Sequence, residues 1–271
     1  MNPHTKNLNR LESVVTLACT GRCKHCSEGE HPAAGPSIDG DAASIVIRDL
    51  CTQYDIQSVM TFGGDPLLCR EAVYNIHAAA REMRIPKRQP ITNGFFSRDE
   101  EEIRRTALRL ARSGVNEILL SVDAFHQETI PPEPVKLFAQ AVKDAGVPIR
   151  THPAWLVSPE DKNPYNERTI EILEEFLRMG IAASEGNTIF PGGNALKYLK
   201  EYFEPGEKPV SPYQEKTDDI HAICIAPDGD VLGGNIYRQG IWSSLKITGH
   251  MGARANHKKC AASGMIGIES G

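Results

Sequence analysis

Ser13–Cys26 has the sequence Ser-Val-Val-Thr-Leu-Ala-Cys-Thr-Gly-Arg-Cys-Lys-His-Cys, in which three cysteines, Cys19, Cys23 and Cys26, directly follow an apolar run. The run Ser13–Leu17 predicts a β-strand, so the cysteines fall in the loop after it. If that loop curls, three thiolates converge on one metal centre. Soft thiolates select zinc or iron–sulfur clusters. The stretch therefore predicts a soft-metal site at the end of a strand.

The spacing of the cysteines favours a cluster over zinc. Structural zinc sites usually have four ligands in paired two-residue spacings. Here three cysteines are separated by three and then two residues. A [4Fe–4S] cluster has four irons, so three cysteines leave one iron open for chemistry. The alternative that stays open is a zinc knuckle that borrows His25 or His31.

Composition narrows the class of protein. The chain has 271 residues, a net charge of −5 and a pI near 6.0, which argues against a nucleic-acid partner held by bulk charge. Its apolar runs fall short of the roughly 18 residues of a membrane span. The polar segment Met1–Arg10 is unlike a signal peptide. We expect a cytoplasmic protein without membrane contact, in which the seven cysteines are thiols or metal ligands rather than disulfides.

Short apolar runs alternate with amphipathic stretches along the chain. The predicted strands are Ser13–Leu17, Gln57–Phe62, Gln89–Thr92, Glu117–Val122, Val147–Thr151 and Gly180–Ala183. The predicted helices are Asp41–Tyr54, Arg70–Met83, Asp99–Ser113, Glu133–Ala145, Asn166–Met179 and Gly193–Phe203. Strand–helix repetition predicts an α/β fold with a parallel sheet, either doubly wound or a partial barrel.

The pattern changes near residue 205. We expect a core over residues 1–204 and a C-terminal extension over residues 205–271, which begins with a loop. Within the extension, Ile223–Ala226 and Asp230–Leu232 flank Pro227-Asp228-Gly229, which predicts a β-hairpin.

The cysteine spacing, placed after the first strand, resembles the signature of the radical S-adenosylmethionine (radical SAM) superfamily. The residue before the third cysteine of that signature is usually aromatic, and His25 fits this position. The resemblance implies a partial (β/α)6 barrel with its active site at the carboxyl ends of the strands. It also implies one [4Fe–4S] cluster on Cys19, Cys23 and Cys26, with the amine and carboxylate of S-adenosylmethionine on the open iron.

The activity that the resemblance implies is reductive cleavage of S-adenosylmethionine. An electron from the cluster breaks the C5′–S bond, and the 5′-deoxyadenosyl radical takes a hydrogen atom from a peptide or small-molecule substrate. An electron donor such as a flavodoxin or ferredoxin would supply the cluster. Two alternatives stay open: an activase for a glycyl-radical enzyme, and a non-catalytic iron–sulfur or zinc-binding protein.

Polar residues follow the next three strands, as the resemblance requires. Gly63-Gly64-Asp65-Pro66 follows the second strand and is assigned to the methionyl amine, with Asp65 where many members have glutamate. The third strand ends in Thr92 and Asn93. Ser121 and Asp123 follow the fourth, with a spacing that puts both on one side of an extended chain, and are assigned to the ribose or the carboxylate.

Further candidates lie after the last strands and in the extension. His126, His152 and Glu185, with Asn187 beside the last, would face the same mouth of a barrel, so we expect substrate binding or proton transfer there. Cys224 and Cys260 are candidate hydrogen-atom donors, with buried or surface thiols as the alternative.

The segment around Cys224 is similar to the start of the cysteine-rich (SPASM-like) extension of peptide-modifying radical enzymes. Gly233 and Gly234 stand where a second cysteine is expected, so we expect no auxiliary cluster. Only about twelve residues precede the first predicted strand, which argues against a leader-peptide domain, so a peptide and a small-molecule substrate stay equally open.

Overall fold

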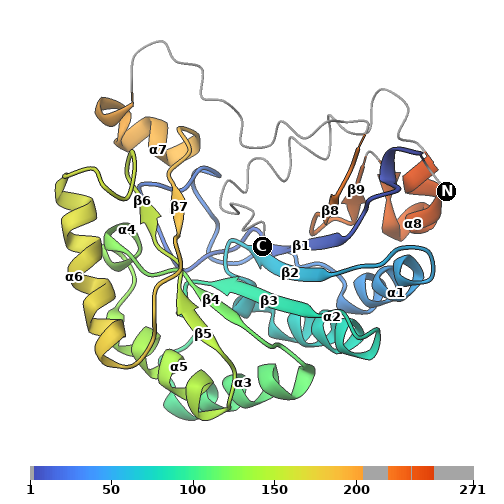
Figure 1. The fold of residues 1–271 in the computed structure, drawn as a ribbon, viewed down its shortest axis with the longest axis horizontal. Coiled ribbons are helices and arrows are strands. Elements are labelled where there is room, and N and C mark those ends of the chain that lie inside the picture. The colour runs from blue at the N-terminus through green and yellow to red at the C-terminus, as the bar shows by residue number, and fades with distance from the viewer. Residues whose placement is uncertain (1–2, 204–218, 233, 247–271) are drawn as a thin grey trace.

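A computed structural model describes residues 3–203, 219–232 and 234–246 (Figure 1). Its core is one six-stranded parallel sheet in the order β5-β4-β3-β2-β1-β8. The strands are β1 (Arg10–Thr16), β2 (Ser58–Gly63), β3 (Lys87–Thr92), β4 (Ile118–Leu120), β5 (Ile149–Thr151) and β8 (Ala222–Ile225). Figure 1 shows the strands fanned out, with the major helices along one side of the sheet. The predicted α/β partial barrel is confirmed.

Five helices cover the outer face of the sheet: α1 (Gly40–Cys51), α2 (Arg70–Glu82), α3 (Glu100–Ser113), α5 (Pro132–Asp144) and α6 (Pro164–Arg178). Side-chain caps set several of their starts, because Asp39, Asp99 and Asn163 each accept hydrogen bonds from the first turn of the helix that follows. Gly114, Gly146 and Gly180 follow helix ends with φ of 96°, 75° and 72°, which suits glycine and matches the predicted stops.

The shorter elements complete the chain. They are the 3-10 turns Pro3–Thr5, Pro66–Cys69 and Lys200–Tyr202, the helices α4 (Ala124–Gln127), α7 (Gly193–Tyr198) and α8 (Ile236–Lys246), and the strands β6 (Ala154–Trp155), β7 (Asn187–Thr188), β9 (Asp230–Val231) and β10 (Gly234–Asn235). The helix predicted over Gly193–Phe203 is thus split into α7 and a 3-10 turn.

The strand predicted at Gly180–Ala183 is wrong in its extent. The structure has an isolated parallel bridge between Thr151 and Ala183, and strand pairing resumes only where β6 pairs with β7. The ladder is interrupted at Pro153, which has no N–H to donate to the neighbouring segment. The Pro153 carbonyl still accepts from the Asn187 N–H at 2.9 Å. The sixth strand of the barrel therefore consists of two short pieces, the bridge residue Ala183 and β7.

The predicted hairpin in the extension is present in part. The turn forms, with Gly229 at φ 82° and the Ala226 N–H donating to the Asp230 carbonyl at 2.9 Å. The first strand, β8, instead joins the main sheet parallel to β1, while β9 pairs antiparallel with β10. Its residues Ile223–Ile225 are all buried, as in a strand covered on both faces. The domain boundary near residue 205 stays a prediction.

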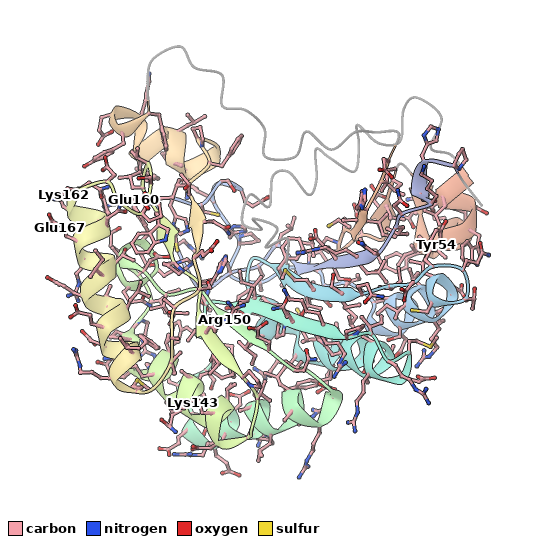
Figure 2. The ribbon with its side chains drawn as sticks, viewed as in Figure 1. Tyr54, Lys143, Arg150, Glu160, Lys162 and Glu167 are labelled. Atoms are coloured by element: carbon pink, nitrogen blue, oxygen red, sulfur yellow. The ribbon has the colours of Figure 1, made fainter. Side chains whose placement is uncertain are left out.

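The edge of the molecule near β8 is closed by α8, which is kinked at Gly240. The rings of Trp242 in α8 and Tyr54 stack with centroids 6.4 Å apart. Figure 2 labels Tyr54 at this edge of the molecule. No helix of the described ranges has the length and apolarity that crossing a bilayer demands.

A second apolar layer lines the inner side of the sheet, beneath the carboxyl ends of the strands. It is a cluster of buried side chains, contributed by five strands: Val14, Met60, Phe62, Ile91, Leu119 and Cys224. Val14, Phe62 and Ile91 of this layer also line the cavity above it. The layer is the dry floor of that cavity.

Candidate functional site

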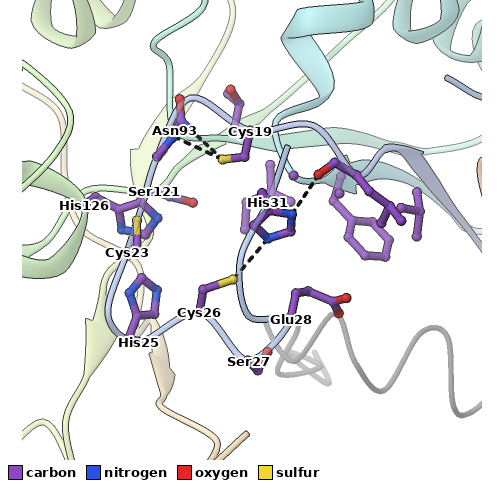
Figure 3. A pocket seen from close by; sticks show the side chains of 18 residues that line it. Cys19, Cys23, His25, Cys26, Ser27, Glu28, His31, Asn93, Ser121 and His126 are labelled. Atoms are coloured by element: carbon purple, nitrogen blue, oxygen red, sulfur yellow. Dashed lines mark hydrogen bonds between the residues drawn. The ribbon is translucent and has the colours of Figure 1, made fainter. Parts of the chain in front are cut away.

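A cavity of about 730 Å³ lies over the carboxyl ends of β1–β4 (Figure 3). All three cysteines of the predicted metal site line it. The other predicted binding residues among its lining are His25, Gly63, Gly64, Thr92, Asn93 and Ser121, joined by His126. The structure thus brings most of the predicted site to one place.

The cysteine loop is held by backbone hydrogen bonds from the end of β2. The Gly64 N–H donates to the Thr16 carbonyl at 2.8 Å, and the Asp65 N–H donates to the Ala18 carbonyl at 2.7 Å. Both acceptors lie directly before Cys19. The segment after β2 therefore fixes where the loop leaves the sheet.

The two glycines after β2 are needed for this close approach. A Cβ added at Gly63 would lie 2.3 Å from the Thr16 oxygen, and one at Gly64 would lie 2.0 Å from the Ala18 oxygen. From the sequence, this segment was assigned to the methionyl amine, yet the atoms that the two glycines approach belong to the loop itself. Both residues also line the cavity, so a contact with a ligand stays a prediction.

The loop is held from its far side by α7, a contact that the sequence analysis missed. Asn194 is buried; its side-chain amide donates to the Cys23 carbonyl at 3.1 Å and its N–H donates to the Cys26 carbonyl at 2.8 Å. Gly193 has φ 47°, and a Cβ there would lie 2.4 Å from the Ser27 oxygen. The sequence signal for this contact was Gly192-Gly193-Asn194 at the start of α7, because glycine permits such a close approach.

Burial suppresses ionisation of the three thiols. It raises the pKa of Cys19 to about 12, and it raises the pKa of Cys23 well above its ordinary value. Burial also raises the pKa of Cys26. The neighbouring sulfurs add to the effect at Cys19 and Cys23, since like charges disfavour each other. A bound metal would reverse it by stabilising the thiolates.

The positions of possible ligand atoms indicate what kind of metal group the side chains around the cavity could hold. Within the described ranges, one group of His, Cys, Asp or Glu residues has ligand atoms that all lie within 4.8 Å of one another: Cys23, His25 and His126. The three cysteine sulfurs do not form such a group, although all three residues line the cavity. Thiolates bind iron–sulfur clusters as well as single soft ions, so the chemistry of the three donors fits a cluster.

Two side chains reach cysteine sulfurs from opposite sides (Figure 3). The amide nitrogen of Asn93 lies 3.6 Å from the Cys19 sulfur, and the Nε2 atom of His31 lies 3.2 Å from the Cys26 sulfur. The Nδ1 atom of His31 donates to the Leu17 carbonyl at 2.7 Å, because a carbonyl can only accept. The sequence offered His31 only as an alternative zinc ligand.

Asp65 is fully buried and lies beside the cavity rather than among its lining residues. Its carboxylate accepts from the Leu67 N–H at 2.8 Å and from the Thr92 hydroxyl at 3.0 Å. Burial raises the pKa of Asp65 to about 6, although these hydrogen bonds oppose the shift. Pro66 begins the 3-10 turn that Asp65 caps. The predicted contact of Asp65 with the methionyl amine stays a prediction.

Asp123 is the buried partner of His126. Its carboxylate accepts from His126 Nδ1 at 2.8 Å and from the backbone N–H of Ala154 at 3.0 Å, and it caps α4. Burial disfavours the charge on Asp123, but the His126 imidazole outweighs this and holds the pKa of Asp123 below its ordinary value. Because a carboxylate only accepts, Nδ1 carries the hydrogen and Nε2 is left for another partner.

The end of β5 forms a second cavity of about 380 Å³ that shares His25, Ser27, Ser121 and His126 with the first. His152 lines it, with Nδ1 2.8 Å from the Ser184 hydroxyl and Nε2 2.9 Å from the Asn187 amide. Ser184 Oγ in turn donates to the Thr151 carbonyl at 3.1 Å. These contacts assign one neutral tautomer to His152, with hydrogen on Nδ1.

The remaining candidates lie elsewhere. The Glu185 side chain is exposed, and its backbone carbonyl accepts from the Trp155 indole at 2.7 Å. Cys224 is buried in the inner apolar layer, and its sulfur is disulfide-bonded, so the prediction that every cysteine is a thiol or metal ligand is wrong here. Composition describes averages and does not reveal which sulfurs the fold brings together. Cys260 lies outside the described residues. Cys51 and Cys69 pack against the core, as predicted.

Comparison with known proteins identifies the family of the chain. The family model described as the radical SAM superfamily matches residues 13–204, while no curated protein matches. Among solved structures, anSMEcpe with bound AdoMet is 14% identical, with a TM-score of 0.57, over 93% of this chain and 82% of that chain.

A second similar structure is Streptococcus suis SuiB bound to the precursor peptide SuiA, 12% identical with a TM-score of 0.55, over 88% of this chain and 65% of that chain. SuiB bound to S-adenosylmethionine is 16% identical with a TM-score of 0.51, over 86% of this chain and 62% of that chain. The chain therefore spans less than two thirds of SuiB. At these identities the likeness shows the fold.

Proposed function

The chain belongs to the radical SAM superfamily, and from this premise we propose that it is an enzyme that binds one [4Fe–4S] cluster on Cys19, Cys23 and Cys26 and cleaves S-adenosylmethionine reductively. The observation that carries the proposal is the convergence of the three cysteines on one cavity at the carboxyl ends of the strands. When bound, the cluster supplies the electron that releases methionine and a 5′-deoxyadenosyl radical from S-adenosylmethionine.

The residues of this chain position the reactants. Asn93 donates toward the Cys19 sulfur, and such a hydrogen bond tunes the reduction potential of a cluster. Gly63, Gly64 and Ser121 line the part of the cavity in which we place S-adenosylmethionine. The buried Asp65 carboxylate bears a desolvation penalty, which the cationic amine of that ligand would offset. The apolar floor excludes water from that side of the cavity, which strengthens the electrostatic interactions inside it.

We place the substrate in the second cavity, beside His152 and Asn187. The residues that line it, among them His152, Pro153 and Ile189, mix polar and apolar side chains, as ligand sites do. Peptide substrates are favoured by the similar structures, since SuiB holds the peptide SuiA and anSMEcpe holds the Cp18Cys peptide. We propose that the 5′-deoxyadenosyl radical takes a hydrogen atom from such a substrate. We propose a small electron-transfer protein, a flavodoxin or ferredoxin, as the source of electrons.

The test is anaerobic reconstitution with iron and sulfide, followed by S-adenosylmethionine and dithionite. We expect about four irons per chain and formation of 5′-deoxyadenosine. The Cys19/Cys23/Cys26→Ala variant should lose both, whereas Cys51→Ala and Cys69→Ala, which change cysteines that pack against the core, should keep both. One tightly held zinc and no 5′-deoxyadenosine from the reconstituted wild type would overturn the proposal.

A further inference from the structure

We propose that the chain has a second metal-binding state, in which Zn²⁺ is held by the sulfur of Cys23 and the imidazoles of His25 and His126 when the cluster is absent. This goes beyond the proposed function, because it concerns a different metal, a different ligand set and the protein before the cluster is assembled.

The three ligand atoms are already close together. They lie within 4.8 Å of one another, and all three residues are buried. Tetrahedral zinc with one sulfur and two nitrogens would hold them about 3.4 Å apart, so small side-chain rotations suffice. Figure 3 shows Cys23, His25 and His126 gathered on one side of the cavity, away from His31. A borderline-soft ion suits a mixed sulfur and imidazole set.

His25 has unsatisfied hydrogen-bonding capacity. It is only 4% exposed, and neither ring nitrogen has a hydrogen-bond partner in the described part of the chain. Its ring contacts that of Phe125, with centroids 5.1 Å apart, and meets that of His126 edge-on at 4.8 Å. A buried polar group without a partner is costly. A metal ion between the two imidazoles would satisfy one nitrogen of each.

His126 is oriented as a metal-binding histidine usually is. Its Nδ1 atom donates to the buried carboxylate of Asp123 at 2.8 Å, which directs Nε2 away from that carboxylate. Asp123 is itself fixed by the Ala154 N–H at 3.0 Å. A carboxylate on the far nitrogen fixes the tautomer and raises the basicity of the nitrogen that binds the metal.

Two other histidines near the cavities lack this arrangement. Both nitrogens of His152 are hydrogen-bonded, to Ser184 and to Asn187. His31 is hydrogen-bonded to the Leu17 carbonyl and to the Cys26 sulfur. His152 is therefore a matched control: it lines the same second cavity as His25 and His126, but its nitrogens are engaged within the protein.

Zinc and the cluster would exclude each other. Both need the Cys23 thiolate, and zinc binding releases the proton of that thiol to solvent. Zinc bound at Cys23, His25 and His126 would therefore protect the empty site and slow the uptake of iron.

The test uses full-length apo-protein, prepared and kept without oxygen, in the Cys19/Cys26→Ala background, which removes the other two sulfurs. We expect one Zn²⁺ per chain by competition with a chromophoric chelator, and a Co²⁺ spectrum of a tetrahedral site with one thiolate. Adding His25→Ala or His126→Ala should weaken zinc binding at least 100-fold, and adding Asp123→Asn should weaken it about 10- to 100-fold. Adding His152→Ala should leave it unchanged.

Circular dichroism of each variant checks its fold. His25→Ala is the decisive variant, since it leaves no hydrogen-bond partner behind. The proposal is overturned if zinc binding is lost in Cys19/Cys26→Ala, or if it survives His25→Ala and His126→Ala.

A second readout is iron uptake by the protein with all three cysteines. Zinc added first should slow iron uptake in the wild type but not in His126→Ala, and equal slowing in both contradicts the proposal. The zinc measurements need no S-adenosylmethionine, so they stand whether or not the proposed function holds.

Discussion

At the end of β4, the imidazole of His126 is held by a buried carboxylate, whereas at the end of β5 the imidazole of His152 lies between a serine hydroxyl and an asparagine amide. The same residue type after neighbouring parallel strands thus has two different surroundings. The difference extends to two walls: the cysteine wall, which is residues 17–31 with the ends of β2, β3 and β4, and the β5–β7 wall, which is residues 149–155 and 182–190.

The two walls differ in what their side chains contact. In the cysteine wall, side chains and backbone amides from distant elements point at the cysteine loop or its sulfurs. In the β5–β7 wall, His152 forms hydrogen bonds with Ser184 and Asn187, beside an interrupted strand pair. We infer that the first wall serves the chemistry shared by the superfamily and the second serves the substrate of this chain. Four predictions test this division between the two walls.

The largest effect is expected from Gly64→Ala in the cysteine wall. Its Cβ would lie 2.0 Å from the Ala18 carbonyl oxygen, so the backbone before Cys19 must move. We expect a loss of about 3 kcal/mol or more in unfolding free energy and loss of bound iron. At Gly146, before β5, a Cβ meets nothing within 4 Å, but φ is 75°, so Gly146→Ala should cost only about 1 kcal/mol and keep iron. Urea unfolding and iron analysis measure both; equal effects would refute the division.

Asp65 should make the apo-protein less stable as pH rises. Its pKa is raised from 3.8 to about 6 by burial, so the folded state binds the proton more tightly than the unfolded state does. The difference of about two pKa units corresponds to about 3 kcal/mol, lost as pH rises from about 4 to just above 6. Asp65→Asn should remove this part of the pH dependence. Urea midpoints of both proteins at pH 4.5, 5.5 and 7 measure it, and parallel pH profiles would contradict it.

Asn194→Ala removes one hydrogen bond that holds the cysteine loop, to the carbonyl of Cys23. The buried carbonyl is left without that donor, so we expect a loss of about 1–2 kcal/mol and lower iron content after reconstitution. Asn187→Ala changes an asparagine of the β5–β7 wall and should keep the iron content of the wild type. If Asn187→Ala loses as much iron as Asn194→Ala, the two walls are not separate.

The smallest effect is expected from Asn93→Ala. Loss of the contact between its amide nitrogen and the Cys19 sulfur, now 3.6 Å, removes a hydrogen bond to a cluster ligand. One hydrogen bond of about 1 kcal/mol corresponds to about 40 mV for a one-electron couple, so the reduction potential should fall by about that amount. EPR-monitored redox titration measures it, with His152→Ala as the control expected not to shift. An unchanged potential in Asn93→Ala would show that the contact does not tune the cluster.

Much of the fold was predictable because its signals are local. Apolar runs of strand length, amphipathic helices and the glycines at 114, 146 and 180 required only neighbouring residues. The errors arose where pairing was not local. The strand at Ala222–Ile225 was assigned to a hairpin, but it pairs with Arg10–Ser13, more than two hundred residues away in sequence. The strand at Gly180–Ala183 failed because Pro153, on its partner, interrupts the ladder.

The candidate site was predictable as a set of residues and not as a set of contacts. Cysteine spacing pointed to the ligands, and polar residues after strands pointed to the lining. The sequence did not reveal that Asp65 and Asp123 are buried partners of Thr92 and His126 rather than lining residues, since a carboxylate after a strand fits either place.

The cysteine triplet, the strand–helix period and the capping residues together determined the superfamily, the sheet and the three sulfurs, because each depends on residues close together in the chain. Which side chain contacts which sulfur, and what holds the cysteine loop, depended on the tertiary structure. Asn93 reaches the Cys19 sulfur across 74 positions, and Asn194 reaches the Cys23 carbonyl across 171. A hydrogen bond depends on distance and direction within fractions of an ångström, and packing between distant elements sets these.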